Sequence, residues 1–573
     1  MDVLGISFGI DTSAALLRDG VTVAAALQER FSRIKHDRSW PAQAIAYCLA
    51  AGDTSIDRVD AVAFFWNPAL HLDFAHPGRA SAYGHHGDFL HMVPAQLLGA
   101  FRPPSGDLAS PHTTQIVHLD GRAPLTIHHV THHRCHAAVA YWPSPFDDAA
   151  VLTVDGFGER VSTTIGAWRS GVYEEHDTVR VPQSLGSFYA ALTAHLGFRP
   201  NNGEGKVMGL APYGDDRYLA RFRALLGTVE GGDAEQPFEL DLRCFEHYLD
   251  TPARVSARFL GEFGPPRRPD EEPTEHHMAL AWATQAVTEE AILGLAKRAH
   301  HKTGLPNLVM AGGVAMNSVA NGRLEREGPF DRVWVQPSSG DGGTAVGAAL
   351  WAHHVIQGGT NRHRWTTDRW GPAFDDDACR DALRRGGWRW TEPDDVIADT
   401  AQALADGELV GWFQGRAELG ARALGGRSIL ADPRPTENKD VLNARVKFRE
   451  GFRPFAPSVT VEAAADFFDL PTGCTVPWMQ KVHPVRADRR SRLGAITHVD
   501  GTARLQTVDA AGAPRYHALI AAFGELTGVP VLLNTSFNVR GEPMVLTPDD
   551  AIRCWATTGL DRLVLGSCVL KKP

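Results

Sequence analysis

The stretch VLGISFGIDTSAALLRDGVTVAAALQE, residues 3–29, carries much of the information about fold class. Its first part, VLGISFG, is an apolar run typical of a buried strand, and a turn around Asp11-Thr12-Ser13 follows it. AALLRDG and VTVAAALQE then supply two more strand-like segments around a tight turn. The stretch therefore predicts a strand, a turn and a hairpin partner that open an α/β domain.

Similar units recur along the chain. Three further apolar runs end in Gly-rich turns: AAVLTVDGFGE (149–159), NLVMAGGVAMN (307–317) and DRVWVQPSSGDGGTAVGAALWA (331–352). The segment 356–372, IQGGTNRHRWTTDRWGP, is polar and aperiodic, and it reads as a linker. We therefore expect an α/β chain of two domains, the first over 1–355 and the second over 373–573.

Composition excludes several classes of protein. The chain has 573 residues and a net charge of −10, which argues against a large nucleic-acid-binding face. Its seven cysteines are scattered without a CxxC pair, which favours a reducing cytoplasm over a disulfide scaffold or a zinc ribbon. The N-terminus lacks signal-peptide features, and no apolar run approaches the length of a membrane span.

Three of the turns are candidates for phosphate binding. They are Asp11-Thr12-Ser13, Asp155-Gly156 and Gly312-Gly313, each placed after a predicted strand. Such turns expose backbone N–H groups, and a helix that begins there adds its dipole. One such turn is usually only a turn. Three at these separations resemble the ATPase fold of actin, hexokinase and the heat-shock chaperones.

A histidine-rich stretch, HHVTHHRCHAAVAYW, spans 128–142. On a helix, His132 and His136 share a face, but the pairs 128/132 and 129/133 have the same spacing, so spacing alone leaves the register open. Asp341 precedes a predicted helix and offers a hard oxygen. Such a mixed N/O set suits Fe(II), Mn(II) or Zn(II). Histidine pairs are common in this chain, so a purely structural role is the alternative.

The second domain contains a run of basic residues between 416 and 453. The run is Arg416, Arg422, Arg427, Arg434, Lys439, Arg445, Lys447, Arg449 and Arg453. A run of charges is usually a solvated face. Here Gly, Leu, Phe and Pro are interleaved with the charges, which favours a pocket for phosphates, since arginine binds them through two N–H groups.

The whole chain resembles a known family, the nodulation/cephem/tobramycin-type O-carbamoyltransferases. In the first domain the similar motifs are HHRCHAAVAYW, VLTVDGFGE, EGKVMGLAPYG, AGGVAMN and SGDGGTAVGAAL. In the second they are GRAELGARALGGRSILADPR, NARVKFREGFRPFAPSV and LLNTSFNVRGEPMV. The first domain is similar to the transferase subunit of tRNA threonylcarbamoylation, which has an actin/hexokinase/heat-shock-chaperone-like (ASKHA) fold. The second is similar to YrdC-type α/β carbamoyl-adenylate synthases.

For the first domain, the resemblance implies a metal held by His132, His136 and Asp341, with Asp155 as a weaker ligand and Fe(II) as the usual ion. It places adenosine against Gly312, Gly313 and Asn317, with Gly156 in the nucleotide site. The family commonly has His-Asp at the first turn, where this chain has Ile10-Asp11. The general base is therefore open among Asp11, Asp155, another histidine and a metal-bound alkoxide.

For the second domain, the resemblance implies contacts to carbamoyl phosphate or nucleotide phosphates. The residues concerned are Arg416, Lys447, Arg449, Arg453 and Arg504. The polar turn that contains Asn534, Ser536, Asn538 and Arg540 would help to hold the nucleotide. Lys35 is similar to a family lysine that reaches from the first domain towards this second site. An ordinary surface lysine is the alternative.

The implied reaction has two halves. Carbamoyl phosphate and Mg-ATP give carbamoyl-adenylate in the second domain, with Lys35 and Arg416 among the catalytic residues, and the first domain transfers the carbamoyl group to a hydroxyl of a small molecule. Phe64, Phe65 and Trp66 and the following stretch 69–114 weakly favour a macrolide or other polyketide as the acceptor. The stretch 69–114 is rich in His, Pro and aromatic residues, and it is either a loop over a site or a packed insertion. A cytoplasmic enzyme without nucleic-acid or membrane partners is expected, and a homodimer is plausible.

Three rival functions follow from related architectures. A tRNA threonylcarbamoylation enzyme would need a basic tRNA-binding face. A hydrogenase-maturation carbamoyltransferase would carry zinc CxxC ribbons and the opposite domain order. An ATP-binding switch of the actin or chaperone type would leave the basic run unexplained.

Overall fold

The computed structural model describes residues 1–68, 93, 96–97, 112–118, 123–228, 237–247, 254–471 and 473–572. The chain divides into two compact units. The first consists of Met1–Gln28 and Arg38–Trp365, and the second of Glu29–Asp37 and Thr366–Pro573. Most of the 69–114 stretch, to which the acceptor prediction refers, lies outside the described residues.

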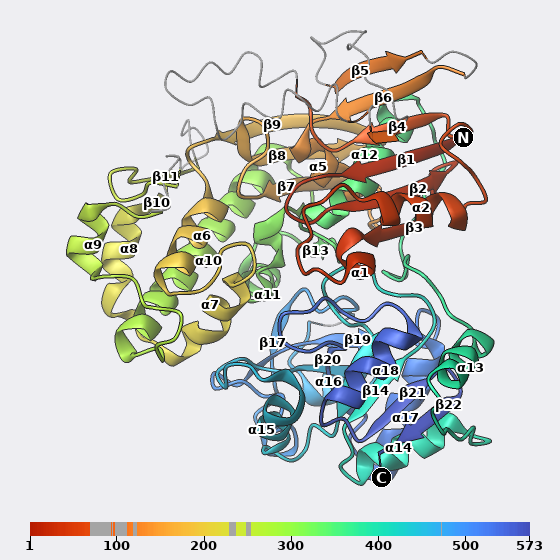
Figure 1. Cartoon of the computed structure of the whole chain (residues 1–573). Coiled ribbons are helices and arrows are strands. Elements are labelled where there is room, and N and C mark those ends of the chain that lie inside the picture. Colours follow the sequence, from red (N-terminus) through yellow and green to blue (C-terminus); the bar gives the residue numbers. More distant parts are fainter. Residues whose placement is uncertain are drawn as a thin grey trace. The chain divides into compact units, whose positions relative to one another are not determined.

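The first unit begins with a six-stranded sheet in the order β3-β2-β1-β4-β6-β5 (Figure 1). Its strands are β1 (Asp2–Ser7), β2 (Ser13–Arg18), β3 (Val21–Leu27), β4 (Ala61–Phe64), β5 (His112–Val117) and β6 (Leu125–Val130). The first three strands form an antiparallel meander, and β4 and β6 continue parallel to β1. The hairpin predicted from residues 3–29 is confirmed.

A second sheet in the same unit repeats this topology in the order β13-β12-β7-β8-β9. Its strands are β7 (Ala149–Val154), β8 (Val161–Arg169), β9 (Val172–Arg180), β12 (Asn307–Ala311) and β13 (Arg332–Val335). Again three strands form an antiparallel meander, and two more run parallel to the first of them. The α/β class and the predicted actin/hexokinase-like first domain are confirmed by this duplicated topology.

Two helices pack between the sheets. They are α5 (His132–Tyr141), which lies on β7 and β12, and α12 (Thr344–Trp351), which lies on β1 and β2. Glycine allows their close approach: a Cβ at Gly347 of α12 would lie 1.9 Å from the carbonyl oxygen of Cys135 in α5. Likewise, a Cβ at Gly5 would lie 1.9 Å from the carbonyl oxygen of Ala345. The backbones of both helices and β1 are therefore in direct contact.

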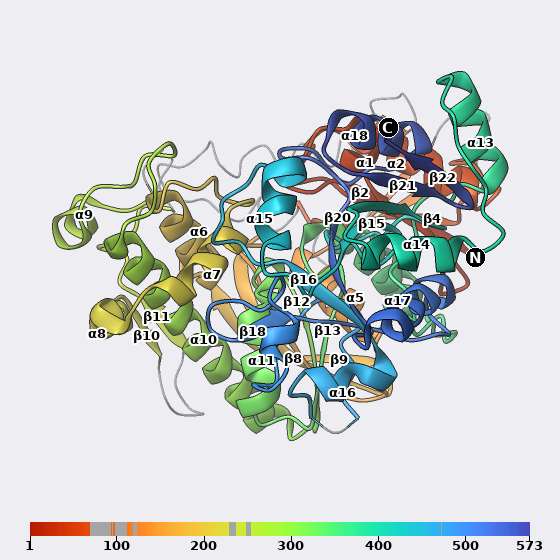
Figure 2. The same ribbon diagram turned by 90° about the horizontal axis from the view of Figure 1, so that it is seen from below.

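Of the remaining helices of the first unit, α2 packs on β2 and β3 and α10 packs on β7 and β8, and α6 to α10 gather at one end (Figures 1 and 2). These helices are α2 (Ala42–Ala51), α6 (Leu185–His195), α7 (Glu204–Leu210), α8 (Leu219–Leu225), α9 (Ala257–Phe263), α10 (Glu275–Thr303) and α11 (Ser318–Glu327). A small hairpin of β10 (Leu226–Thr228) and β11 (Phe238–Leu240) lies in the same region.

The second unit is built on a seven-stranded mixed sheet in the order β19-β16-β20-β15-β14-β21-β22. Its strands are β14 (Val410–Phe413), β15 (Arg427–Ala431), β16 (Ala456–Thr460), β19 (Gln506–Val508), β20 (Val531–Ser536), β21 (Arg562–Leu565) and β22 (Cys568–Lys571). A separate ladder pairs β17 (Val482–Pro484) with β18 (Thr502–Arg504). The YrdC-like character of this unit stays a prediction.

Apolar cores lie on both faces of this sheet. Trp412 and Leu430 belong to one core, while their neighbours Phe413 and Ile429 belong to the other, as the period of two in a strand requires. The helices are α13 (Asp376–Arg385), α14 (Val396–Ala405), α15 (Asn438–Leu442), α16 (Ala464–Phe467), α17 (Pro514–Thr527) and α18 (Pro548–Thr557). Of these, α14 and α17 lie side by side on the first core (Figure 2).

The segment Glu29–Asp37 packs with the second unit although it follows β3 directly in sequence. It begins within the short helix α1 (Gln28–Ser32). Arg30 donates a hydrogen bond to the carbonyl oxygen of Gly420 at 2.8 Å, and Arg33 donates to the carbonyl oxygens of Pro543 and Met544. Buried Arg30 and half-buried Arg33 thus hold the segment that contains Lys35 within the second unit.

We predict that Gly347→Ala destabilises the first unit by about 3 kcal/mol, because the added Cβ has no room against Cys135. Gly294→Ala in α10 is the matched control: nothing lies within 4 Å of its Cβ position, so the variant should gain up to about 1 kcal/mol from helix propensity. Calorimetric unfolding would measure both changes. Equal midpoints for the two variants would contradict the close-packing argument.

Candidate functional site

The first unit brings two imidazoles and two carboxylates together. One ligand atom from each of His132, His136, Asp155 and Asp341 lies within 4.8 Å of the others. The Nε2 atoms of His132 and His136 are 3.0 Å apart, and the Oδ2 atom of Asp155 is 3.1 Å from the first and 2.9 Å from the second. Asp341 Oδ1 is 3.6 Å from His132 Nε2. The structure thus assembles the register predicted for the histidines.

Three elements position these side chains. The histidines occupy the first turns of α5, Asp155 follows β7, and Asp341 precedes α12. The hydroxyl of Ser7 donates to the carbonyl oxygen of Asp341 at 3.2 Å, and that of Ser13 donates to the carbonyl oxygen of Gly342 at 2.9 Å. Both ends of the first hairpin turn therefore hold the turn that carries Asp341. The sequence alone gave no reason to select either serine for this role.

Charge and burial shift the protonation of all four groups. Burial alone would lower the pKa of His132, but the hydrogen bond with Asp155 and the charge of Asp341 raise it to about 9. Burial and the charge of His132 lower the pKa of His136. Burial would raise the pKa of Asp155, but hydrogen bonds with both imidazoles hold it well below its usual value. Burial and the charge of Asp155 raise the pKa of Asp341 to about 7. Without a cation, the cluster therefore retains protons.

His133, the neighbour of the pair, forms hydrogen bonds through both of its ring nitrogens. Its Nδ1 lies 2.7 Å from the hydroxyl of Thr153, and its Nε2 lies 2.9 Å from the carbonyl oxygen of Val161. Burial lowers its pKa to about 3. A neutral ring with both nitrogens engaged is no candidate for a ligand or a base.

The predicted phosphate turns lie around the same cluster. Gly156 donates its N–H to Asp155 Oδ1, and a Cβ at Gly313 would lie 3.0 Å from that oxygen. Gly312 has a φ of +100°, and a Cβ there would lie 2.2 Å from the carbonyl oxygen of Val154, so only glycine fits. The charge of Asp11 contributes to the raised pKa of Asp341. All three turns thus meet at the ends of β1, β7 and β12.

Asn317, predicted to contact adenosine, is engaged within the protein. Its Oδ1 accepts the N–H of Ala320 at the start of α11 and a hydrogen bond from Gln285. Its amide nitrogen donates back to Gln285 Oε1 at 2.9 Å. A contact between Asn317 and a nucleotide would have to use the remaining hydrogen-bonding capacity of this side chain.

Glu159 is a residue of this region that the sequence analysis did not select. Its carboxylate accepts the backbone N–H of Asn67 at 2.7 Å and that of His132 at 3.1 Å. Burial raises its pKa to about 7. A single glutamate after a Gly-rich turn carries no sequence signal for this role, because its backbone partners come from two distant segments.

The second unit gathers positive charge. Arg422, Lys447, Arg449, Arg453 and Arg504 form a cation cluster, defined by their mutual effects on pKa. Burial and Arg453 lower the pKa of Arg422 to about 10 and that of Arg449 to about 9. Burial, Arg422, Arg449 and Arg453 together lower the pKa of Arg504 well below its usual value. Such mutual destabilisation favours binding of an anion.

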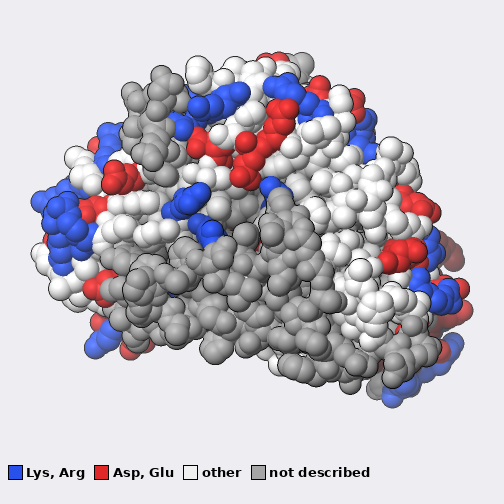
Figure 3. Space-filling model, turned by 90° about the horizontal axis from the view of Figure 1, so that it is seen from above, with Lys and Arg blue, Asp and Glu red and all other residues white. Residues whose placement is uncertain are grey.

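The cluster is short of acidic partners. Glu450 lies 3.8 Å from Arg453 and 3.7 Å from the nearby Arg540. Within the described ranges, no carboxylate forms an ion pair with Arg422 or Arg504. On the face drawn in Figure 3, by contrast, basic and acidic side chains are interspersed. Arg422 belongs to the predicted basic run, but only the fold distinguishes it from its paired neighbours.

The other predicted residues divide into two groups. Lys35 lies close enough to Lys447 to lower its pKa, and the Lys447 ammonium donates to Asn538 Oδ1 at 2.8 Å and to the carbonyl oxygen of Ser536. Asn538 in turn accepts from the Ser536 hydroxyl, and Arg540 donates to the carbonyl oxygen of Phe448. Apart from Lys447, which belongs to the cluster, these residues border it.

Arg416 and Asn534 form hydrogen bonds with protein atoms. The Arg416 guanidinium donates to the carbonyl oxygens of Trp370 and Gly371. The Asn534 amide donates to Ala423, Ser458 and Gln506 in the interior of the sheet. Both therefore support the loop that carries Arg422.

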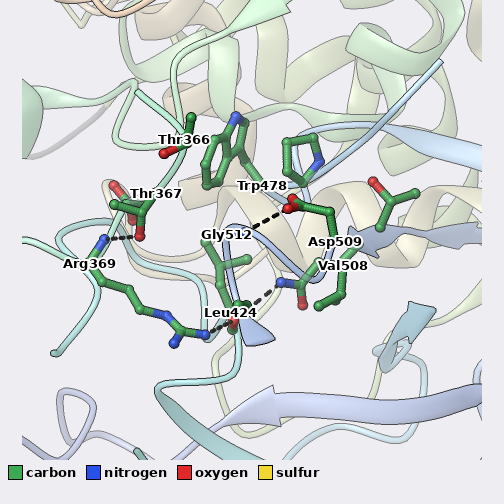
Figure 4. Close-up of a pocket in the computed structure, with 13 residues that line it drawn as sticks. Thr366, Thr367, Arg369, Leu424, Trp478, Val508, Asp509 and Gly512 are labelled. Carbon is green, nitrogen blue, oxygen red and sulfur yellow. Dashed lines mark hydrogen bonds between the residues drawn. The ribbon is translucent and has the colours of Figure 1, made fainter. Parts of the chain in front are cut away.

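A pocket of about 340 Å³, part of it open to solvent, lies on the second unit (Figure 4). It is lined by Thr366, Thr367, Asp368, Arg369, Leu424, Pro477, Trp478, Gln506, Thr507, Val508, Asp509, Gly512 and Ala513. Arg369 and Gln506 both donate to the carbonyl oxygen of Leu424. None of the site residues predicted from the sequence is among its lining residues.

No helix in the described part of the chain is both long and apolar enough to cross a membrane.

Comparison with known proteins assigns the family. The family sequence model described as Carbamoyltransferase N-terminus matches residues 2–350, and that described as Carbamoyltransferase C-terminus matches residues 401–572. An uncharacterized protein of Synechocystis is 40% identical, with 100% of this chain and 96% of that protein covered. The nodulation protein NolNO of Sinorhizobium fredii is 39% identical, with 99% of this chain and 79% of NolNO covered.

Solved structures are more distant. HypF of T. kodakarensis is 14% identical, with a TM-score of 0.31, and the match covers 63% of this chain and 48% of HypF. Component A of (R)-2-hydroxyglutaryl-CoA dehydratase from Acidaminococcus fermentans is also 14% identical, with a TM-score of 0.28, 61% of this chain and 97% of that chain covered. The family assignment rests on sequence: with both of its regions matched in order, the chain belongs to the carbamoyltransferase family and is a carbamoyltransferase enzyme.

Proposed function

We propose that this carbamoyltransferase is an ATP-dependent O-carbamoyltransferase that moves the carbamoyl group of carbamoyl phosphate, through carbamoyl-adenylate, to a hydroxyl of a small-molecule natural product. The observation that carries the proposal is the cation cluster of the second unit, where Arg422 and Arg504 lack acidic partners among the described residues. Carbamoyl phosphate and ATP together bring several negative charges, which such a cluster can offset.

The first half-reaction belongs to the second unit. Water releases phosphate from carbamoyl phosphate, and the carbamate oxygen attacks the α-phosphorus of ATP, forming carbamoyl-adenylate with pyrophosphate as the leaving group. The arginines stabilise negative charge on the phosphoryl oxygens as it develops. Lys447 holds the turn at Ser536 and Asn538, and Lys35 adds a further positive charge beside it.

The second half-reaction belongs to the first unit. The acceptor hydroxyl attacks the carbamoyl carbon, the C–O bond to the phosphate breaks, and AMP leaves. We assign the hydroxyl proton to Asp11, because the Asp155 carboxylate is already shared by His132 and His136. This assignment gives Ile10 no role in proton transfer.

His132, His136 and Asp341 are proposed to hold a divalent metal, with Asp155 beside them. Two imidazole nitrogens and two carboxylate oxygens within 4.8 Å of one another form a donor set that suits Fe(II) and related ions. Such an ion supplies Lewis-acid polarisation of a carbonyl or phosphoryl oxygen. Fe(II) and Mg-ATP are therefore the proposed cofactor and co-substrate.

The acceptor class stays a prediction. Phe64, Phe65 and Trp66, which favoured a macrolide or other polyketide, are buried. The rings of Phe65 and Trp66 pack against that of His132, with centroids 5.6 and 5.5 Å away. They form an apolar wall behind the site, which is compatible with an apolar acceptor and equally with an ordinary core.

We expect the purified chain, supplied with Fe(II) and Mg-ATP, to form AMP and pyrophosphate only when carbamoyl phosphate is present. The reason is that the carbamate, and not water, is the proposed nucleophile at the α-phosphorus. Chromatographic separation of AMP and ADP gives the readout. Formation of ADP, or turnover indifferent to carbamoyl phosphate, would reject the adenylate mechanism.

Removal of one cation of the cluster should have opposite effects on the stability of the second unit and on its binding of an anion. Arg504→Met should stabilise the ligand-free second unit by about 0.5–2 kcal/mol, because it removes a buried like charge. It should also abolish the rise in melting temperature that pyrophosphate gives the wild type.

Arg445→Met is the matched control for that variant. Arg445 lies in the same basic run but pairs with Asp561 at 2.5 Å, so its loss should leave the pyrophosphate effect intact. Thermal unfolding with and without pyrophosphate measures both variants. An undiminished pyrophosphate effect in Arg504→Met would contradict the cluster's role.

Metal binding should become stronger as pH rises. The pKa of His132 is raised to about 9 without metal, so below that pH a cation must displace its proton. We expect Co(II) affinity to rise roughly tenfold per pH unit between about pH 7.5 and 9, where His132 carries the one proton to be released, and more steeply below about pH 7, where Asp341 is protonated as well. Calorimetry in buffers of different ionisation enthalpy measures that proton, and a pH-independent affinity would show that the cluster is not the binding site.

A further inference from the structure

Helix α5, which carries both histidines, has an unusual start. Its N-cap residue, Thr131, makes no side-chain capping hydrogen bond. The first helical residue is His132, whose N–H has no partner within the helix. The partner here is the Glu159 carboxylate, with both oxygens within 3.2 Å of that nitrogen. The acid that completes this helix start is thus 27 residues away in sequence.

The imidazole rings have no comparable support. The Nδ1 atoms of His132 and His136 are buried and have no hydrogen-bond partner in the portion of the chain that the structure describes. A metal-binding histidine usually donates its second ring nitrogen to a carboxylate or carbonyl, which orients the ring. In this site the position of His132 must instead come from its backbone and from the packing of Phe65 and Trp66.

Glu159 supports both of those elements. Besides His132, it accepts the N–H of Asn67 at 2.7 Å, and Asn67 directly follows Trp66. The Asn67 side chain is held in turn by the hydroxyl of Thr113 in β5 at 2.8 Å. One buried carboxylate therefore joins the start of α5 to the end of β4, after which Phe65 and Trp66 follow. The backbone of the neighbouring Gly158 lies close to His132: a Cβ at Gly158 would lie 2.8 Å from the Cβ of His132, which leaves no room for a shift.

We propose that Glu159 is the positioning residue of this site: its carboxylate sets the placement of His132 through the backbone and thereby the affinity and geometry of the bound cation. The inference rests on the metal site of the proposed function. Glu159 is 6% exposed, and its carboxylate accepts from the backbone N–H groups of Asn67 and His132. Its effect reaches the chemistry only through His132 and the Phe65–Trp66 wall.

The test is Co(II) binding by the whole 573-residue chain. Calorimetry measures the affinity, and the visible ligand-field spectrum reports the geometry of the bound ion. Glu159→Ala removes both acceptor oxygens and should weaken Co(II) binding by about 10- to 100-fold and change the spectrum. Glu159→Gln retains one acceptor oxygen, folds without a buried charge, and should give an intermediate loss. This graded order distinguishes positioning from a general loss of packing.

Asp177→Asn serves as the control for destabilisation alone. Asp177 in β9 forms an ion pair with the buried Arg298 in α10 of the same unit. This ion pair includes neither His132 nor His136. The substitution should lower the melting temperature and leave Co(II) affinity and spectrum unchanged. Glu159 variants that are folded and bind Co(II) as the wild type does would overturn the inference while the metal site stands. The His132→Ala variant should bind no Co(II). If the wild-type protein also binds none, the metal site itself is overturned, and the inference with it.

Discussion

Direct backbone contact between α5, α12 and β1 is the constraint on which the first unit depends. The contact exists because Gly347 and Gly5 have no side chains at the crossing points. Packing at this distance leaves no freedom to slide, so the start of α5 and the turn before α12 are held in register. The imidazoles on one helix and Asp341 at the start of the other are brought together by this contact, although more than 200 residues separate them.

Electrostatics differ between the two units, and the difference matches the proposed division of labour. In the first unit, acids and imidazoles neutralise one another through shared protons, with the pKa of His132 raised and that of Asp155 lowered. A cation can replace those protons with little change in net charge. In the second unit, the cation cluster is only partly neutralised by Glu450, and each arginine destabilises the charge of its neighbours. This arrangement favours an anionic ligand and makes the ligand-free state less stable.

Several residues that were predicted as ligand contacts form hydrogen bonds within the protein. Lys447 is held by the turn at Ser536 and Asn538, Arg416 by the carbonyl oxygens of Trp370 and Gly371, and Asn317 by Gln285. Residues selected by resemblance as ligand contacts can thus act one step away, through the loops that they hold. The same reasoning applies to Arg30 and Arg33, which tie residues 29–37 to the second unit by donating to backbone carbonyl oxygens.

The sequence by itself determined the α/β class, the opening hairpin and the family, because these depend on local patterns and on ordered motifs. The pair His132 and His136, which the structure brings together with Asp155 and Asp341, was predicted only through the family resemblance, since spacing allowed three pairs. Only the tertiary structure could show that Glu159 caps α5 and that residues 29–37 pack with the second unit. It also shows that Arg445 has an acidic partner, while Arg422 and Arg504 have none in the described ranges. These features depend on contacts between residues far apart in sequence, and such contacts are set by the packing of whole elements, which no local pattern encodes.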